Sequence, residues 1–239
     1  MEVLYEDNHI IVVNKAVGEI VQGDKTGDEP LVETLKGWIK EKYAKPGNVF
    51  CGLVHRLDRP VSGVVVFAKT SKALTRMNEM FRLGKVRKTY WAVTAGNPPQ
   101  PEGELVHYIT STERTNKSTA WAEPRRGAKE ARLSYRLIAS SDRYNLLEVN
   151  LATGRKHQIR AQLAAIGCPI KGDLKYGAKR SNPDGGISLM ARRIEFIHPV
   201  SGQRIDVTAP VPAGDNLWAA MERLAATDGH ESQSENSTK

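Results

Sequence analysis

The sequence of 239 residues predicts an α+β fold, with a central mixed, mostly antiparallel β-sheet flanked by helices. The chain contains many segments that are expected to be strands, among them residues 61–68, whose β-branched residues suit a strand better than a helix. These segments do not alternate regularly with helical ones, and no glycine-rich phosphate loop joins a strand to a helix, so a parallel α/β sheet is disfavoured. An apolar content of 40% with 26% charged residues is sufficient for a real core.

The first part of the chain contains two expected strands and one expected helix. One strand is expected at residues 9–14, and another at residues 61–68, where Pro60 marks the turn that precedes it. A helix is expected at residues 30–43, because apolar side chains recur there at helical spacing. These side chains are Leu31, Leu35, Trp38 and Ile39.

A second helix is expected to begin at Ser71, a plausible N-cap, and to end at Gly84. Its core-facing side chains are Leu74, Met77 and Phe81. The pattern then predicts three strands, at residues 89–95, 131–138 and 145–151. Apolar and polar residues alternate in the last of these, as they do in a strand with one buried face.

The remaining elements are a third helix and two strands. The helix is expected at residues 155–166 and is closed by Gly167. Its core-facing side chains are Ile159, Leu163 and Ile166. The two strands are expected at residues 192–197 and 204–208. We expect one large domain over residues 1–225 and a polar, disordered tail over residues 226–239.

The balance of charge indicates a polyanionic partner. The formal net charge is +8 and the pI is near 9.5. Basic side chains that neutralise phosphates release condensed counterions, and this release favours binding to a polyanion. The basic residues form three clusters: Arg155, Lys156, Arg160, Lys171, Lys175, Lys179 and Arg180; Arg82, Lys85, Arg87 and Lys88; and Arg125, Arg126, Lys129 and Arg132. A solvated surface explains many of these side chains individually, but together they favour a nucleic-acid groove.

Several classes of protein are disfavoured. Cys51 and Cys168 are far apart and belong to no Cys/His pattern typical of zinc sites, so we expect neither a disulfide framework nor a metal. The N-terminal segment lacks the basic flank and apolar core of a secretion signal, and no apolar run is long enough to span a bilayer. We therefore expect a soluble, cytoplasmic protein with no membrane partner.

The strongest candidate site is the segment of residues 53–70, LVHRLDRPVSGVVVFAKT. Because Pro60 directs the chain from a turn into a buried strand, Asp58 is expected at the mouth of that strand, between Arg56 and Arg59. Functional groups favour such positions, since a rigid core holds the loop while the loop faces solvent. The alternative is a surface ion pair between Asp58 and its neighbouring arginines.

Three separated motifs carry a resemblance to a known family. They are HRLDRPVSGVVVFAKT at residues 55–70, RKTYWA at residues 87–92 and TGRKHQIRAQLAAIGCPIKGDLKYG at residues 153–177. Their order and context resemble the RluA-type RNA pseudouridine synthases, and the opening LYEDNHIIVVNK and the closing LMARRIEFIHP and VTAP fit the same pattern. The resemblance covers residues 4–210. It implies the pseudouridine synthase fold with an active-site cleft, and it makes residues 1–225 the catalytic domain.

The resemblance implies an enzyme, an isomerase that converts specific uridines of rRNA or tRNA to pseudouridine without a cofactor. The C1′–N1 glycosidic bond breaks, the uracil turns, and C5 is joined to C1′. This chemistry needs an ionised carboxylate near C1′ and a base for the C5 proton. Asp58 matches the family's catalytic aspartate. Its role stays open between attack on the sugar, attack on the base and abstraction of a sugar proton.

Three further residues match functional positions of the family. Arg160 matches the basic residue that pairs with the catalytic aspartate, where a guanidinium favours the charged carboxylate and orients it; the alternative is a phosphate-binding arginine. Tyr90 matches the tyrosine that stacks on the target base and is a candidate proton relay; the alternative is a tyrosine that fills the core. Arg56 matches a position thought to fill the gap left by a flipped nucleotide.

The remaining expected substrate contacts are His55, Arg59, Arg155, Lys156, His157 and Leu189. His55 and His157 have a structural alternative, in which each makes only local hydrogen bonds. Leu189 is a candidate for lining the uracil pocket. We interpret Asp173, in GDLKYG, as a structural residue of a turn.

The sequence departs from the family pattern at a few positions. Lys15 is followed by Ala16 where the family usually has proline, and Gln162 and Met190 stand where many members carry histidine. The family pattern begins at about residue 4, so we expect a short form without the S4-like RNA-binding domain. RNA selection should then rest on the loops and basic clusters of the catalytic domain. We expect a monomer with no obligate protein partner.

Two rival interpretations remain. A catalytically silent RNA-binding module of the same fold would keep the basic clusters without needing Asp58, Tyr90 and Arg160 together. An unrelated glycosidase would need a second carboxylate across the scissile bond. The only other acid in the three motifs is Asp173, so the glycosidase is disfavoured.

Overall fold

The computed structural model describes residues 1–24 and 26–234, and the chain divides into two compact units. The first unit comprises residues 1–88 and 191–209, and the second comprises residues 89–190 and those from 210 onward. Each unit contains part of a β-sheet and its own helices, so the architecture is α+β as the sequence predicts.

The sheet of the first unit has the strand order β1-β2-β4-β10, with β3 beside β4 and β11 beside β10. The strands are β1 (Glu2–Glu6), β2 (Ile10–Lys15), β3 (Gly52–Leu53), β4 (Ser62–Ala68), β10 (Leu189–Ile197) and β11 (Arg204–Thr208). The pairs β1–β2, β2–β4, β3–β4 and β10–β11 are antiparallel. Every residue of β4 is buried, which agrees with the apolar run that follows Pro60.

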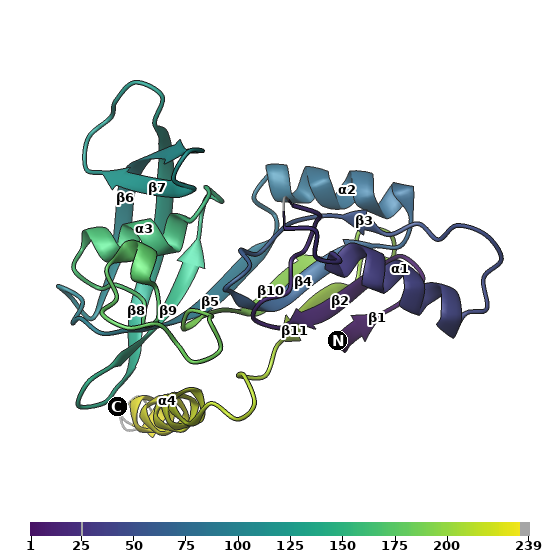
Figure 1. The fold of residues 1–239 in the computed structure, drawn as a ribbon. Coiled ribbons are helices and arrows are strands. Elements are labelled where there is room, and N and C mark those ends of the chain that lie inside the picture. The colour runs from purple at the N-terminus through teal and green to yellow at the C-terminus, as the bar shows by residue number, and fades with distance from the viewer. Residues whose placement is uncertain (25, 235–239) are drawn as a thin grey trace. The chain divides into compact units, whose positions relative to one another are not determined.

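Two helices, α1 (Leu31–Lys42) and α2 (Ser71–Arg82), lie above these strands in Figure 1. Their buried residues include Leu31, Leu35 and Ile39 of α1 and Ala73 and Met77 of α2. The expected N-cap of α2 is wrong by one residue. The hydroxyl of Thr70, whose backbone is extended, accepts the N–H of Ala73, so Ser71 is the first helical residue.

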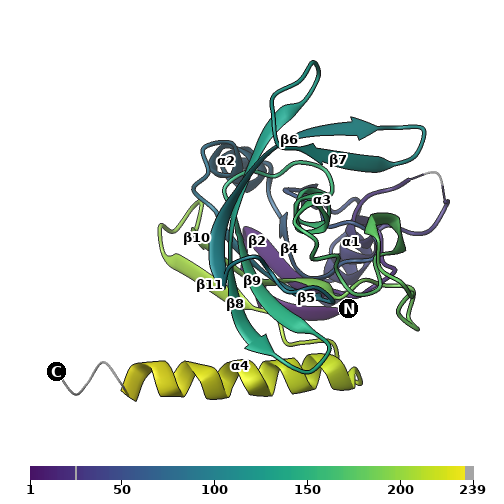
Figure 2. The ribbon, with the colours of Figure 1, turned by 90° about the vertical axis from the view of Figure 1, so that its left-hand side faces the viewer.

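The sheet of the second unit is antiparallel and has the strand order β5-β9-β8-β6-β7. Its strands are β5 (Arg87–Thr94), β6 (Glu102–Thr112), β7 (Lys117–Trp121), β8 (Lys129–Ser140) and β9 (Asn145–Leu151). The helices are α3 (Gln158–Ala165), the 3₁₀ turn η1 (Leu174–Tyr176) and α4 (Asn216–Ser234). Figure 2 shows α3 beside the curved strands β6 and β8, with α4 below them.

The helix expected at residues 155–166 is shorter than the sequence predicts. The amide side chain of Gln158 explains this difference, because its oxygen accepts the N–H of Arg155 and the hydroxyl of Thr153. These bonds hold the preceding residues in a turn, and His157 has a left-handed backbone with φ of 52°. The helix therefore begins at Gln158.

Within the described part of the chain, four strands and one α-helix were absent from the sequence-based expectation, namely β1, β3, β6, β7 and α4. Strands β6 and β7 are only half-buried and carry many polar residues, so their apolar pattern is weak. Helix α4 extends through residues 226–234, which were expected to be disordered. Trp218 and Met221 are buried and anchor the first turns of the helix, and the helix continues from these turns. The rest of the expected tail, residues 235–239, lies outside the described residues.

Candidate active site

In the first unit, Asp58 lies in a tight turn that leads into β4. The N–H of Val61 donates to the Asp58 carbonyl at 3.0 Å, and the N–H of Gly18 donates to the Arg59 carbonyl at 3.0 Å. Gly63 follows with φ of +110°, and a Cβ there would lie 2.2 Å from the Ala191 carbonyl oxygen, so only glycine fits. The backbone from Asp58 to Gly63 is therefore held in one conformation.

Lys15, at the end of β2, holds the same turn from inside the unit. Its side chain is fully buried, and its Nζ donates to the carbonyls of Ala16, Arg59 and Val61 at 3.0, 3.2 and 2.7 Å. Burial lowers the pKa of Lys15 to about 8, against the opposing effect of the nearby carboxylates of Glu19 and Asp58. Lys15 thus provides a buried positive charge and three hydrogen bonds close to the candidate catalytic residue.

The side chain of His55 contacts β4 and α2. Its Nε2 accepts the N–H of Val66 at 3.0 Å, and its ring stacks on Phe81 with centroids 4.9 Å apart. Burial, with a smaller contribution from the charge of Lys88, lowers the pKa of His55 to about 3. The side chain is therefore neutral at physiological pH and supports β4. Its expected contact with substrate stays a prediction.

The two arginines beside Asp58 are exposed and do not behave alike. The guanidinium of Arg59 donates to the carboxylate of Asp28 at 2.5 Å, so that arginine ties down a loop before α1. Arg56 is exposed on the side of the turn that precedes Asp58. Arg56 thus meets the first requirement for a side chain that enters an RNA stack, which is access to solvent.

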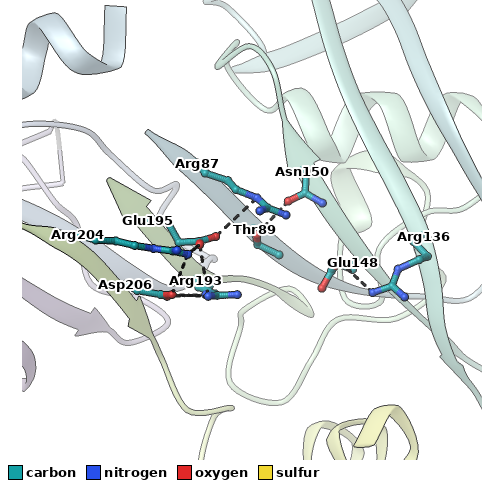
Figure 3. Close-up of polar contacts among 9 residues, drawn as sticks. All are labelled: Arg87, Thr89, Arg136, Glu148, Asn150, Arg193, Glu195, Arg204 and Asp206. Atoms are coloured by element: carbon teal, nitrogen blue, oxygen red, sulfur yellow. Dashed lines mark hydrogen bonds and ion pairs between the residues drawn. The ribbon is translucent and has the colours of Figure 1, made fainter. Parts of the chain in front are cut away.

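In the second unit, Tyr90 lies on β5 opposite Val149 of β9 and is only 8% exposed. On the residue before it, the hydroxyl of Thr89 donates to the side-chain oxygen of Asn150 at 2.9 Å (Figure 3). The strand pairing and this side-chain bond fix the part of β5 that carries Tyr90. A buried, rigidly held ring is a suitable stacking platform for a base, although core packing alone would produce the same burial.

Arg160 lies in α3 and forms a bidentate ion pair with Asp173. Its Nε and Nη2 donate to the two carboxylate oxygens at 2.7 and 2.9 Å, and the side chains are 6% and 1% exposed. The structure thus confirms that GDLKYG forms a turn, which holds Asp173 beneath the guanidinium. A guanidinium carries five N–H donors, so a pair with Asp173 is compatible with further acceptors on its remaining edge.

Tyr176 contacts both Arg160 and His157. The guanidinium carbon of Arg160 lies 5.0 Å from the centroid of the Tyr176 ring, a cation–π distance. The Nδ1 of His157 lies 2.9 Å from the Tyr176 hydroxyl oxygen, and both side chains are buried. His157 is therefore held by a residue 19 positions along the chain, and its expected contact with substrate stays a prediction.

The loop before α3 carries Arg155 and Lys156, two of the expected substrate contacts. Both residues are exposed, and the Nε of Arg155 donates to the Glu130 carbonyl at 2.9 Å. The Gln158 amide nitrogen donates to the Arg132 carbonyl at 3.0 Å, which fastens the loop to β8. The loop thus presents cations to solvent from a backbone that is held in place.

Leu189 begins β10 and is buried, and its expected place in lining the uracil pocket stays a prediction. The residue before it, Ser188, accepts a hydrogen bond from the side chain of Asn182 at 3.1 Å. Asn182 in turn accepts from the Lys171 ammonium at 2.6 Å. This chain of polar contacts holds the segment that precedes Leu189 against the loop after α3.

Ion pairs reduce the number of basic side chains that are available to an RNA. In the first unit, Arg87, Arg193 and Arg204 surround Glu195, with Asp206 beside them (Figure 3). In the second unit, Arg136 pairs with Glu148 at 3.3 Å (Figure 3). Several exposed residues of the three predicted basic clusters take part in none of these ion pairs. They include Arg155, Lys156, Lys175, Lys179, Arg180, Arg125, Arg126 and Lys129.

The predicted site residues are divided between the two units. Asp58 lies in the first unit with His55, Arg56 and Arg59, whereas the second unit contains Tyr90, Arg155, Lys156, His157, Arg160 and Leu189. The contacts of Asp58 with Arg160 and Tyr90 that the family resemblance implies therefore stay predictions.

Sequence reasoning missed three supporting residues. Lys15 was noted only for the residue that follows it, and Asp173 was interpreted as a turn residue rather than as the partner of Arg160. Tyr176 was not singled out. A signal existed for Asp173, which is the lone acid among seven basic residues in the segment 153–180.

Among residues 1–24 and 26–234, no group of three or more His, Cys, Asp or Glu side chains is arranged to hold a metal ion. Within the same ranges, no helix combines the length and the apolar character needed to cross a lipid bilayer.

Comparison with known proteins identifies the family. Residues 9–165 match the family model described as RNA pseudouridylate synthase. The chain is 34% identical to a ribosomal large subunit pseudouridine synthase D of Xanthomonas campestris pv. campestris, covering 94% of this chain and 69% of that protein. It is 31% identical to a tRNA pseudouridine synthase C of Vibrio vulnificus, covering 92% of this chain and 94% of that protein.

A solved structure supports the same fold. The human RNA pseudouridylate synthase domain containing 4 matches with a TM-score of 0.75 at 23% identity, covering 94% of this chain and 93% of that one. The chain spans about two thirds of the length of several of the curated relatives that it matches. Together with the match over residues 9–165, these similarities show that the chain belongs to the RluA-type family of RNA pseudouridine synthases, which are isomerases.

Proposed function

We propose that this protein converts specific uridines of ribosomal or transfer RNA to pseudouridine, with Asp58 as the catalytic aspartate. The observation that carries the proposal is the rigid turn of Asp58, which the buried Lys15 holds through the carbonyls of Arg59 and Val61. Exchange of a glycosidic N1 for C5 needs a carboxylate in a fixed position near C1′. The buried Lys15 ammonium lies close enough to Asp58 for the two charges to interact.

We propose that Arg160 is the partner that orients Asp58 in the assembled site. Its guanidinium is held in one orientation by the bidentate pair with Asp173, so its remaining N–H groups are pre-organised. A fixed guanidinium is more effective than a mobile one, because less side-chain entropy is lost when it binds a carboxylate. The pair with Asp173 also offsets the cost of burying the positive charge.

We propose that Tyr90 stacks on the uracil of a flipped nucleotide. Flipping is needed because the reacting C1′ and C5 atoms are not accessible inside a base stack. The pairing of β5 with β9 supports this role, since it holds Tyr90 in a fixed strand and a rigid ring stacks at a low entropic cost. Arg56, exposed beside Asp58, is suited to fill the gap in the RNA.

The substrate proposal rests on the relatives and on charge. One relative is described as a ribosomal large subunit enzyme and another as a tRNA enzyme. The exposed cations of the second unit, such as Arg155, Lys156 and Lys175, are suited to phosphate contacts. We further propose that the protein acts in the cytoplasm as a monomer and without a cofactor.

The test of the proposal is the variant D58N, which keeps the size of the side chain and removes its charge. We expect pseudouridine formation in a mixture of ribosomal and transfer RNA to fall by at least about 10³-fold, since the reacting carboxylate is lost. RNA affinity and its salt dependence should stay at the wild-type values, because the phosphate contacts are unchanged. The measurement pairs chemical mapping of pseudouridine with filter binding at several salt concentrations.

D28N is the matched control, because Asp28 is an exposed acid that pairs with Arg59 from a neighbouring loop. It should retain near-wild-type activity. Substantial turnover by D58N would remove Asp58 from the mechanism. Unchanged pseudouridine maps in RNA from a deletion strain would exclude ribosomal and transfer RNA as the substrates.

A further inference from the structure

Tyr176 is a buried tyrosine that the proposed reaction does not use, and yet it contacts the surroundings of Arg160. It ends the 3₁₀ turn η1, which begins directly after Asp173. Its ring lies beneath the Arg160 guanidinium, whose carbon is 5.0 Å from the ring centroid. Its position is therefore coupled to Arg160 by the ring itself and by the turn that carries Asp173.

The hydroxyl of Tyr176 connects two further elements. Its oxygen accepts the N–H of Ser118 on β7 at 2.8 Å and lies 2.9 Å from Nδ1 of His157 at the start of α3. Ser118 is also bonded to this region through its hydroxyl, which donates to the Lys156 carbonyl at 2.8 Å. One phenol oxygen therefore joins the β6–β7 hairpin to the helix that carries Arg160.

We propose that Tyr176 is a positioning residue, which holds the Arg160 guanidinium in its working orientation and links it to the β6–β7 hairpin. The inference rests on the proposed function of Arg160. A tyrosine that only filled the core would need its ring but not these two polar partners, which come from elements distant in sequence. Burial raises the pKa of Tyr176, so the hydroxyl keeps its proton and can serve both partners.

The β6–β7 hairpin and the residues beside it carry cations that are held in place. The ammonium of Lys117, on β7, lies 5.3 Å from the Tyr176 ring centroid, and that of Lys175 donates to the Asn116 carbonyl at 3.0 Å. Arg125, which follows β7, stacks on Trp121 at 3.4 Å. Cations that are held in this way suit the phosphate backbone of an RNA.

The variant Y176F tests the proposal, because it removes the hydroxyl and keeps the ring. We expect the single-turnover rate of pseudouridine formation to fall by about tenfold, since small displacements of a catalytic group are costly. The dissociation constant for the same RNA should change by less than about twofold, because no phosphate contact is removed. Y135F is the matched control, since Tyr135 is buried in the same unit on β8, and it should leave both values unchanged.

A second readout reports on Arg160 directly. The Nε–H of Arg160 donates to Asp173, so its NMR signal should exchange slowly with water in the wild type. We expect Y176F to accelerate this exchange, and Y135F to leave it unchanged. A slower reaction together with faster exchange supports the positioning role.

Three outcomes would overturn the inference: an unchanged rate, an unchanged Arg160 signal, or a loss of RNA affinity that accounts for the whole loss of rate. Y176L, which also removes the ring, should be more impaired than Y176F, and an equal or smaller effect would count against the cation–π contact. These results are distinguishable from failure of the proposed function, because D58N tests that function without involving Tyr176.

Discussion

The two units hold their candidate catalytic residues in different ways. In the first unit, the turn of Asp58 is fixed by backbone groups, and one buried amine, that of Lys15, donates to three carbonyls. In the second unit, Arg160 is fixed by contacts between side chains, namely those of Asp173 and Tyr176. Backbone support tolerates most side-chain changes, whereas a side-chain network depends on the chemical identity of every member. The difference predicts where substitutions will be most damaging.

The largest effect is expected for D173N, which removes the charge of the buried partner of Arg160. Breaking a buried pair leaves an uncompensated charge, so the free energy of unfolding should fall by about 3–5 kcal/mol. Pseudouridine formation should fall with it, because Arg160 loses its fixed orientation. Urea unfolding and a single-turnover assay measure the two effects.

D206N is the control for D173N, because Asp206 pairs with the more exposed Arg193 (Figure 3). D206N should lower the free energy of unfolding by at most about 1 kcal/mol, as is usual for ion pairs near the surface. Equal costs for D173N and D206N would show that the second unit does not depend on its side-chain network.

The next effect is expected for K15M, which removes the amine beneath the Asp58 turn. The Val61 carbonyl loses the Lys15 donor and the Arg59 carbonyl keeps the N–H of Gly18, so activity should fall at least about tenfold. Stability should fall less than for D173N at pH 7, because the cost of burying the charged amine disappears as well. Retention of full activity by K15M would show that the backbone bonds alone hold the turn.

The pH dependence of stability sharpens this test. Between pH 8 and 10.5 the unfolded Lys15 keeps a proton that the folded one releases, so this group makes the wild type more stable as the pH rises. Between pH 8 and 10.5 this group adds about 3 kcal/mol to the free energy of unfolding. K15M should lack it, so the stability of the wild type relative to K15M should increase from pH 7 to pH 9.5 in urea unfolding.

The smallest effect concerns His55, which also supports the backbone of the first unit. The unfolded histidine gains a proton below pH 6.5, whereas the folded one, with a pKa of about 3, does not, so this group destabilises the protein as the pH falls through that window. At pH 5 the loss relative to pH 8 should be about 2 kcal/mol. H55Q keeps an acceptor for the N–H of Val66 but gains no proton. Its stability should therefore fall less between pH 8 and 5, and an equal fall would assign the acid sensitivity to other groups.

Much of the fold follows from local patterns in the sequence. The strands β2, β4, β9 and β11 lie within one residue of their expected bounds, because their apolar pattern and the turn residues beside them are local features. Strands β6 and β7 were missed, since they pair with each other while only partly buried. The start of α3 was misplaced because the Gln158 side chain holds the residues before it in a turn. Side-chain bonds of this kind leave no periodic signal.

The sequence by itself determined the fold class, the family and the turn that carries Asp58, because each depends on residues that are close together or on motifs read in order. Only the tertiary structure decided that Asp173 and Tyr176 surround Arg160, and that Lys15 lies beneath the turn of Asp58. These contacts join residues on separate elements, up to 46 positions apart. Their formation depends on which groups are buried together, and a buried charge must find its partner there.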